Sequence, residues 1–317
     1  MRYHSLDSLR GFVMLLGIVF HISMAYITLP VKWFVNDPSR SISFDIVCLL
    51  IHTFRIPVFF IIAGFFSAMM FERKTIIEVV KNRFSRIFIP FVLGVLFIIP
   101  LLQLMYIGGD FVLNNSTDLA ILKGSIINHF SFINLSKQMW LMHLWFLYYL
   151  LLFYLLHIVL LKINQRTLLK NVSEKIYNWF SLEKRGRIIM PVLLTALSLY
   201  TMSGWLADTP AVYQPELKYF LYYGVFYIFG NLFYQNRHEL EEIKKRSWLN
   251  LVLGIFLLFP IYLVLFMSFG MKKGISNYFL FQGVTLLILS ACIWLIAFGL
   301  IGLSIRYLNK ENRIVRY

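Results

Sequence analysis

Long apolar stretches recur along the whole chain and constrain its fold more than any other feature. Each is about twenty residues long, which is the length an α-helix needs to cross the hydrocarbon core of a bilayer. Of the 317 residues, 59% are hydrophobic and 14% are charged. A soluble domain of that composition would expose large apolar patches. The sequence therefore predicts an all-α, polytopic transmembrane helix bundle that forms a single domain over residues 1–317. Eight spans are expected, at 11–29, 44–70, 87–107, 140–161, 188–206, 218–234, 248–269 and 279–304.

The basic residues are distributed unevenly between the two sets of loops. With alternating spans, 22 of the 30 Lys and Arg residues fall on the side of the amino terminus, 7 fall on the opposite side, and Arg55 lies within a span. Because basic short loops stay on the cytoplasmic side, we expect both termini in the cytoplasm and the loop at 108–139 outside. This pattern accounts for the net charge of +15 without a nucleic-acid partner. Cys48 and Cys292 both lie in apolar spans and predict neither a disulfide nor a metal site.

Charged and protonatable residues accompany the first apolar span. Asp7 and Arg10 precede its apolar part, and His21 lies within it. Ionisable groups at membrane depth are costly and usually serve a site. On a helix, Arg10 and His21 share one face and are separated by about 16 Å along the axis. We expect His21 to lie near the middle of the membrane or slightly towards the outside, with no partner on its own helix.

A second group of polar residues is expected in the outer half of the membrane. His52 and Arg55 lie in the second span, and His143 lies at the outer start of the fourth. An arginine at that depth needs a partner, and Asp45 on the same helix is the candidate. His143 lies in an aromatic-rich segment and is equally compatible with an anchor at the membrane interface.

Other basic residues are expected near the inner surface of the membrane. Arg83 and Arg86 follow the second span. Their charges are compatible with the preference for basic residues on the cytoplasmic side alone, or with the binding of phosphate groups. His157 lies near the inner end of the fourth span and is interpreted as incidental.

A histidine within the membrane, with arginines on its cytoplasmic side, is compatible with two mechanisms. In the first, His21 is a general base that deprotonates a hydroxyl, which then attacks an activated acyl group. The inner arginines would hold the phosphates of the acyl carrier. In the second, His21 relays protons or binds ligand in the path of a transporter or polysaccharide exporter. The residues by themselves leave both mechanisms open.

Four motifs give the chain a resemblance to a known family. It resembles the membrane-bound acyltransferase-3 family of bacteria, most closely the branch that includes the succinyltransferase of osmoregulated periplasmic glucans. The resemblance covers about the first half of the chain. Its motifs are LDSLRG and FHIS around Arg10 and His21, IHTFRIPVFFIIAGFFS at 51–67, RFSRIFIP at 83–90 and HLWFL at 143–147.

The resemblance implies transfer of an acyl group, acetyl or succinyl, from cytoplasmic acyl-CoA to hydroxyls of an envelope glycan or glycolipid. Acyl-CoA would be a co-substrate, with no permanently bound cofactor and no metal, and the protein would lie in the bacterial inner membrane. His21 becomes the candidate base with Arg10 as its family partner, and Arg83 and Arg86 become candidate contacts for coenzyme A. His52, Arg55 and His143 are expected to bind the acceptor on the outer side.

The chain departs from the family pattern at two places. Ala63 stands where the family often has serine before Gly-Phe, so a hydroxyl at this position is not essential here. The family has about ten spans and continues into a Tyr-Leu-x-His motif. The resemblance therefore implies a chain that lacks its last two helices.

Overall fold

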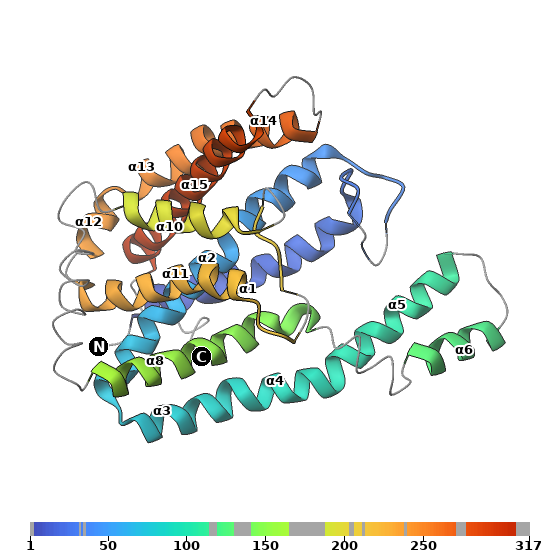
Figure 1. Ribbon diagram of the computed structural model, residues 1–317, viewed down its shortest axis with the longest axis horizontal. Helices are drawn as coiled ribbons and strands as arrows, with labels where there is room; N and C mark the ends of the chain where they lie inside the picture. The colour runs from blue at the N-terminus through green and yellow to red at the C-terminus, as the bar shows by residue number, and fades with distance from the viewer. Residues whose placement is uncertain are drawn as a thin grey trace.

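The computed structural model describes residues 3–31, 33, 36–113, 119–129, 141–164, 188–202, 206–210, 213–237, 240–270 and 277–308. Every regular element among these residues is a helix, which confirms the all-α class (Figure 1). The longest helices are α1 (His4–Ser23), α2 (Ile42–Arg73), α8 (Trp145–Asn164), α11 (Leu217–Gln235) and α15 (Tyr278–Tyr307). The shorter ones are α3 (Ile76–Arg83), α4 (Ile89–Leu93), α5 (Ile99–Leu113), α6 (Leu119–His129), α10 (Ile189–Tyr200), α12 (Leu240–Lys245), α13 (Ser247–Val252) and α14 (Phe259–Gly270).

Six helical stretches in the described part of the chain are long and apolar enough to cross a membrane. They are His4–Tyr26, Ile42–Arg73, Ile76–Gly109, Met142–Ile163, Ser247–Ser268 and Tyr278–Tyr307. These correspond to six of the eight expected spans. The other two expected spans correspond to α10, which has 12 residues, and α11, which has 19 residues. The protein is a multi-pass membrane protein.

Helices α2 and α15 form the centre of the bundle. In the apolar segment of each, 67% of the residues are buried inside the protein, whereas in the first span 22% are. Helix α2 packs between α1 and α11, and α15 packs against α10 and α13. Where α2 meets α11, the backbones approach so closely that a Cβ atom on Gly64 would overlap the carbonyl of Tyr227. Small residues allow such contacts between membrane helices.

Among the described residues, three π-helical turns widen the helices, and a proline follows each of them. The turns are Phe84–Phe88, Gly94–Ile98 and Leu253–Leu258, followed by Pro90, Pro100 and Pro260. Proline has no N–H and its ring clashes with the carbonyl one turn earlier, so a wider turn before it relieves the conflict. The first two turns join α3, α4 and α5 into one helical rod, which begins before the span expected at 87–107.

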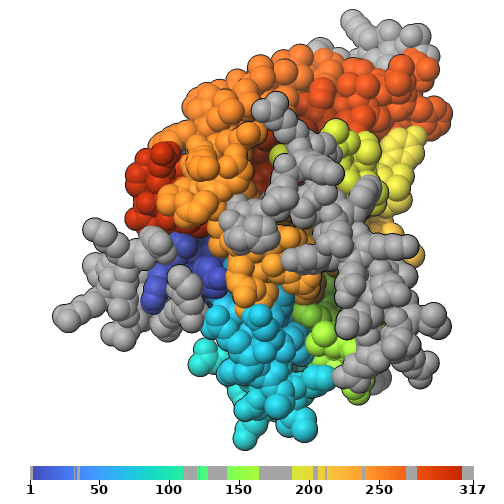
Figure 2. Space-filling model, turned by 90° about the vertical axis from the view of Figure 1, so that its left-hand side faces the viewer, coloured from blue at the N-terminus to red at the C-terminus, as the bar shows by residue number. Residues whose placement is uncertain are grey.

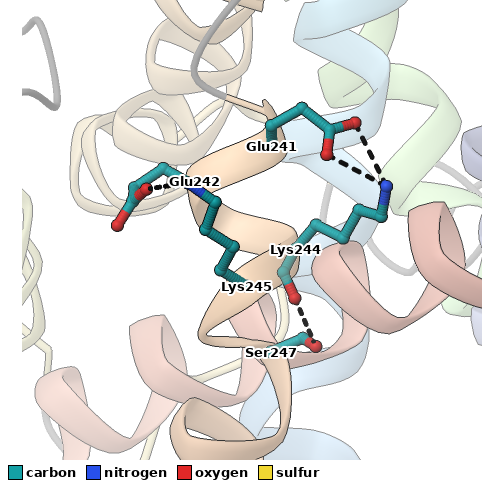
Figure 3. A network of polar contacts seen from close by, with 5 residues as sticks. All are labelled: Glu241, Glu242, Lys244, Lys245 and Ser247. Atoms are coloured by element: carbon teal, nitrogen blue, oxygen red, sulfur yellow. Dashed lines mark hydrogen bonds and ion pairs between the residues drawn. The ribbon is translucent and has the colours of Figure 1, made fainter.

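Most of the described charged residues gather at one end of the bundle. The start of α1, the α2–α3 turn and α12 lie at the left in Figure 1, and Figure 2 looks onto this end. Helix α3 begins at a capping box in which Thr75 and Glu78 satisfy each other's backbone N–H groups. On α12, Lys244 pairs with Glu241 at 2.9 Å and Lys245 pairs with Glu242 at 3.3 Å (Figure 3).

Candidate functional site

His21 lies at the opposite end of α1 from the charged surface. The helix begins at His4 and ends at Ser23, so His21 is in its last turn rather than near its middle. His21 therefore lies further towards the end of the helix than the expected position midway or slightly outward, because the helix begins seven residues before the apolar part of the sequence. The depth of His21 in the membrane stays a prediction. The imidazole packs against the side chains of two other residues. It is stacked on the ring of Trp33, with centroids 5.6 Å apart, and its centroid lies 4.3 Å from that of His143.

Arg55 reaches from α2 onto α1, one turn before His21. Its guanidinium lies over the ring of Phe20, 5.1 Å from the centroid. It also touches the helix backbone at Gly17, where an added Cβ atom would overlap a guanidinium nitrogen. Arg55 and His21 therefore approach the same turn of α1 from two sides.

Asp45 is not the partner of Arg55. Its carboxylate accepts hydrogen bonds from the backbone N–H of Thr28 at 2.9 Å and of Leu29 at 3.1 Å, and from the Thr28 hydroxyl. The expected pairing fails because the chain after α1 folds back over the start of α2. Asp45 instead closes the α1–α2 connection.

His52 has a hydrogen-bond partner of its own. Its Nε2 lies 2.8 Å from the carbonyl oxygen of Ala207, in the segment before α11, and its ring stacks on Phe20 at 5.6 Å. This bond ties α2 to a loop that is distant in the sequence. Neither Ala207 nor Trp33 was identified as part of the site from the sequence. Trp33 was detectable as a large aromatic residue in a short polar loop.

The arginines expected on the cytoplasmic side, Arg10, Arg83 and Arg86, do not form a single group. Arg10 pairs with Asp7 at 3.1 Å and lies over Phe66, so it does not contact His21. Arg83 turns inward, where it lies over Tyr154 at 4.8 Å and contacts the sulfur of Met70. Arg86 lies in the π-helical turn that follows and is exposed.

Unsatisfied nitrogen atoms mark the residues of the site. In the described part of the chain, four buried side-chain atoms have no hydrogen-bond partner: His21 Nδ1, His143 Nδ1, Arg55 Nε and Arg83 Nε. Buried polar groups are nearly always satisfied, so each exception needs an explanation. All four atoms belong to residues that the sequence analysis selected as site residues. Three of them gather around the end of α1.

A second polar cluster is centred on His157 and lies nearer the charged end of the bundle than the residues around His21 do (Figure 1). This group is named the inner cluster, and the group of His21, His143 and Arg55 is named the outer cluster. The hydroxyl of Tyr227 donates to Ser67 Oγ at 2.6 Å, and Ser67 Oγ lies 3.0 Å from His157 Nδ1. The amide nitrogen of Asn231 lies 3.2 Å from His157 Nε2. His157 is therefore not incidental but joins α2, α8 and α11. A signal in the sequence was Asn231, a polar residue in an otherwise apolar stretch.

Comparisons of the sequence with known proteins identify its family. Residues 3–317 match a family described as an acyltransferase domain. Two relatives, both called "Glucans biosynthesis protein C", come from Escherichia coli strain K12 and Escherichia coli O1:K1 / APEC. Each is 42% identical over 103 residues, which covers 32% of this chain and 25% of the relative. No solved structure matches the chain. The family match extends over nearly every residue, and the chain therefore belongs to the acyltransferase-3 family.

Proposed function

We propose that this protein is an integral membrane O-acyltransferase of the bacterial cytoplasmic membrane, with both termini of the chain in the cytoplasm. It transfers an acetyl or succinyl group from cytoplasmic acyl-CoA to hydroxyls of an envelope glycan or glycolipid. The observation that carries the proposal is the set of unsatisfied nitrogens on His21, His143 and Arg55. Family membership and the name of the two relatives support the reaction and the class of acceptor.

His21 acts as the general base in this proposal. Its Nδ1 has no partner among the described residues, which leaves it available to a hydroxyl of the acceptor. His143 and Trp33 contact the ring and limit its rotation. His143, His52 and Arg55 form the end of the site that faces the acceptor, in agreement with their predicted position in the outer half of the membrane.

The donor approaches from the other end of the bundle. Arg83 has an unsatisfied Nε and lies at the level of Tyr154 on α8, eleven residues from His143. This corresponds to about 16 Å along the helix. Phosphates bound by Arg83 and Arg86 would leave the flexible arm of coenzyme A to cover that distance towards His21. Arg10 lies at the same end of the bundle but is paired with Asp7, and it is too far along α1 to contact His21.

The test is mass spectrometry of envelope glycans from cells that produce the wild-type protein or the His21→Ala variant. We expect a fixed mass increment per modified sugar with the wild-type protein and none with the variant. The mass of the increment identifies the acyl group. Undiminished acylation by the variant would rule out His21 as the base. If the variant instead reduced the amount of glycan outside the cell at unchanged acylation, an exporter would replace the acyltransferase.

A further inference from the structure

We infer that Arg55 is a catalytic residue that stabilises the oxyanion formed during acyl transfer, and that Gly17 is the positioning residue that seats its guanidinium beside His21. The inference rests on the proposed function. It assigns Arg55 to the reacting carbonyl rather than to recognition of the acceptor, and it assigns a role to Gly17, which no motif in the sequence had singled out.

The first observation is the contact between the guanidinium of Arg55 and Gly17. Gly17 is a buried residue of α1, and the position that its Cβ atom would occupy is taken by a guanidinium nitrogen of Arg55. His21 follows one turn later on the same helix, and residues four apart lie on one face at about 5–6 Å between Cβ atoms. The base and the cation are therefore neighbours on α1, although they come from different helices.

The second observation is that the cation has no anionic partner in the described part of the chain. Asp45, on the same helix, is held by Thr28 and Leu29, and Arg55 Nε has no hydrogen-bond partner. A guanidinium at membrane depth is costly without compensation and normally pairs with a carboxylate. A permanent carboxylate would neutralise the charge before the reaction began. An unpaired guanidinium can instead respond to negative charge that develops only in the transition state.

The third observation is the low-dielectric surroundings. Arg55 lies over Phe20, whose ring is also 5.0 Å from that of His21 and 5.6 Å from that of His52. In such surroundings a preorganised donor stabilises a developing charge far more than it would in water.

The chemical step follows from this geometry. The acceptor hydroxyl transfers its proton to His21 as its oxygen forms a bond to the thioester carbonyl carbon. The π electrons of the carbonyl move onto its oxygen, and the resulting oxyanion receives hydrogen bonds from the guanidinium of Arg55. The carbonyl then re-forms, the carbon–sulfur bond breaks, and the leaving thiolate takes the proton from His21. The products are an ester and coenzyme A with a free thiol.

The experiment measures kcat and KM of the full chain in detergent or lipid, with acetyl-CoA and succinyl-CoA as donors. Arg55→Gln is expected to lower kcat by about 10²–10³, the usual effect of removing an oxyanion donor. The loss of kcat should be similar with acetyl-CoA and with succinyl-CoA. The KM for the acceptor should stay within about twofold of the wild-type value, because the interaction forms only in the transition state. Arg55→Lys keeps the charge without the planar fork and should retain part of the activity.

The variant Gly17→Ala changes the position of the Arg55 guanidinium and leaves its charge in place. Alanine favours a helix over glycine, so this variant should unfold at the same temperature as the wild type or higher. It nevertheless displaces the guanidinium, and kcat should fall at least tenfold. The matched control is Gly11→Ala on the same helix, because no atom lies within 4 Å of its added Cβ. Gly17→Ala should add little to the defect of Arg55→Gln, since both remove the same contact.

Different outcomes overturn different conclusions. If the wild-type protein transfers neither acyl group, the proposed function fails and the inference fails with it. If the wild type is active and His21→Ala is inactive, but Arg55→Gln keeps its kcat, the function stands and the oxyanion role is wrong. A loss confined to succinyl-CoA would make Arg55 a carboxylate-binding residue instead. A loss confined to the KM of the acceptor would return it to acceptor recognition.

Discussion

The two polar clusters of this bundle contain similar side chains but differ in how completely they are hydrogen-bonded. In the inner cluster, Ser67, His157, Tyr227 and Asn231 come from three helices and bond to one another. In the outer cluster, the rings of His21 and His143 lie 4.3 Å apart, yet the Nδ1 atom of each has no partner among the described residues. The sequence predicts a site at His21 and His143, whereas His157 is interpreted from it as incidental.

The difference in hydrogen bonding separates a structural role from a functional one. A satisfied polar network in an apolar interior holds helices together and specifies their arrangement. An unsatisfied group carries a cost in the free energy of folding and is retained where a ligand or substrate completes its bonds. The inner cluster therefore fits a structural role, and the outer cluster fits a site. The following predictions test this distinction.

The largest expected effect is that of His21→Ala on the rate of acyl transfer. Loss of a general base lowers kcat by about 10²–10⁴. The temperature of unfolding should change little, because the variant loses the ring contacts with Trp33 and His143 but also removes a buried nitrogen that has no partner among the described residues. Steady-state kinetics and a thermal unfolding curve of the same preparation check both parts. A clear loss of thermal stability would assign His21 to the structural group.

Arg83 and Arg86 test whether an unsatisfied buried nitrogen also marks the proposed binding site of acyl-CoA. Arg83 has an unsatisfied Nε, whereas Arg86 is exposed. Loss of a buried charge-assisted hydrogen bond is worth about 1.5–3 kcal/mol, so Arg83→Gln should raise the KM for acyl-CoA by about 10–100-fold. Arg86→Gln should raise it by less than about fivefold, with an effect that shrinks at high salt. Equal effects of the two variants on KM would contradict the criterion.

His157→Ala is expected to show the opposite pattern to His21→Ala. It leaves Ser67 and Asn231 with fewer partners in a buried place, at a cost of about 1–3 kcal/mol in the free energy of unfolding. The kcat of the folded protein should change little. Unfolding by heat or denaturant in detergent measures the first quantity, and kinetics normalised to folded protein measures the second. A large fall in kcat at unchanged stability would place His157 in the reaction.

The smallest effect is expected at the charged surface of α12. Lys245→Ala removes an exposed ion pair to Glu242 (Figure 3). Exposed pairs contribute about 0–1 kcal/mol, so neither stability nor acyl transfer should change measurably. This variant is the control for the other four variants. A marked loss of activity would indicate that α12 contacts a substrate or partner.

Several features of the fold were predictable because they depend on local sequence. A membrane span is recognised from about twenty consecutive apolar residues, and six of the eight expected spans appear as helices of sufficient length and hydropathy. The positions of α10 and α11 were also expected. Helix α10, with 12 residues, is shorter than the span expected at 188–206, whereas α11, with 19 residues, agrees with the span expected at 218–234. The π-helical turns before Pro90, Pro100 and Pro260 were not anticipated from the sequence.

The sequence by itself determined the class of fold and the family, and it selected the residues of the proposed site, because hydropathy and the spacing of motifs lie within single segments. Only the tertiary structure decided which side chains meet. Asp45 binds the chain after α1, and Arg55 contacts Gly17. Trp33 stacks on His21, and His157 lies within hydrogen-bond distance of Ser67. These contacts depend on how α1, α2, α8 and α11 approach one another, which no single segment encodes. The same packing leaves nitrogens of the outer cluster without partners among the described residues, and this property supports the proposed role of His21.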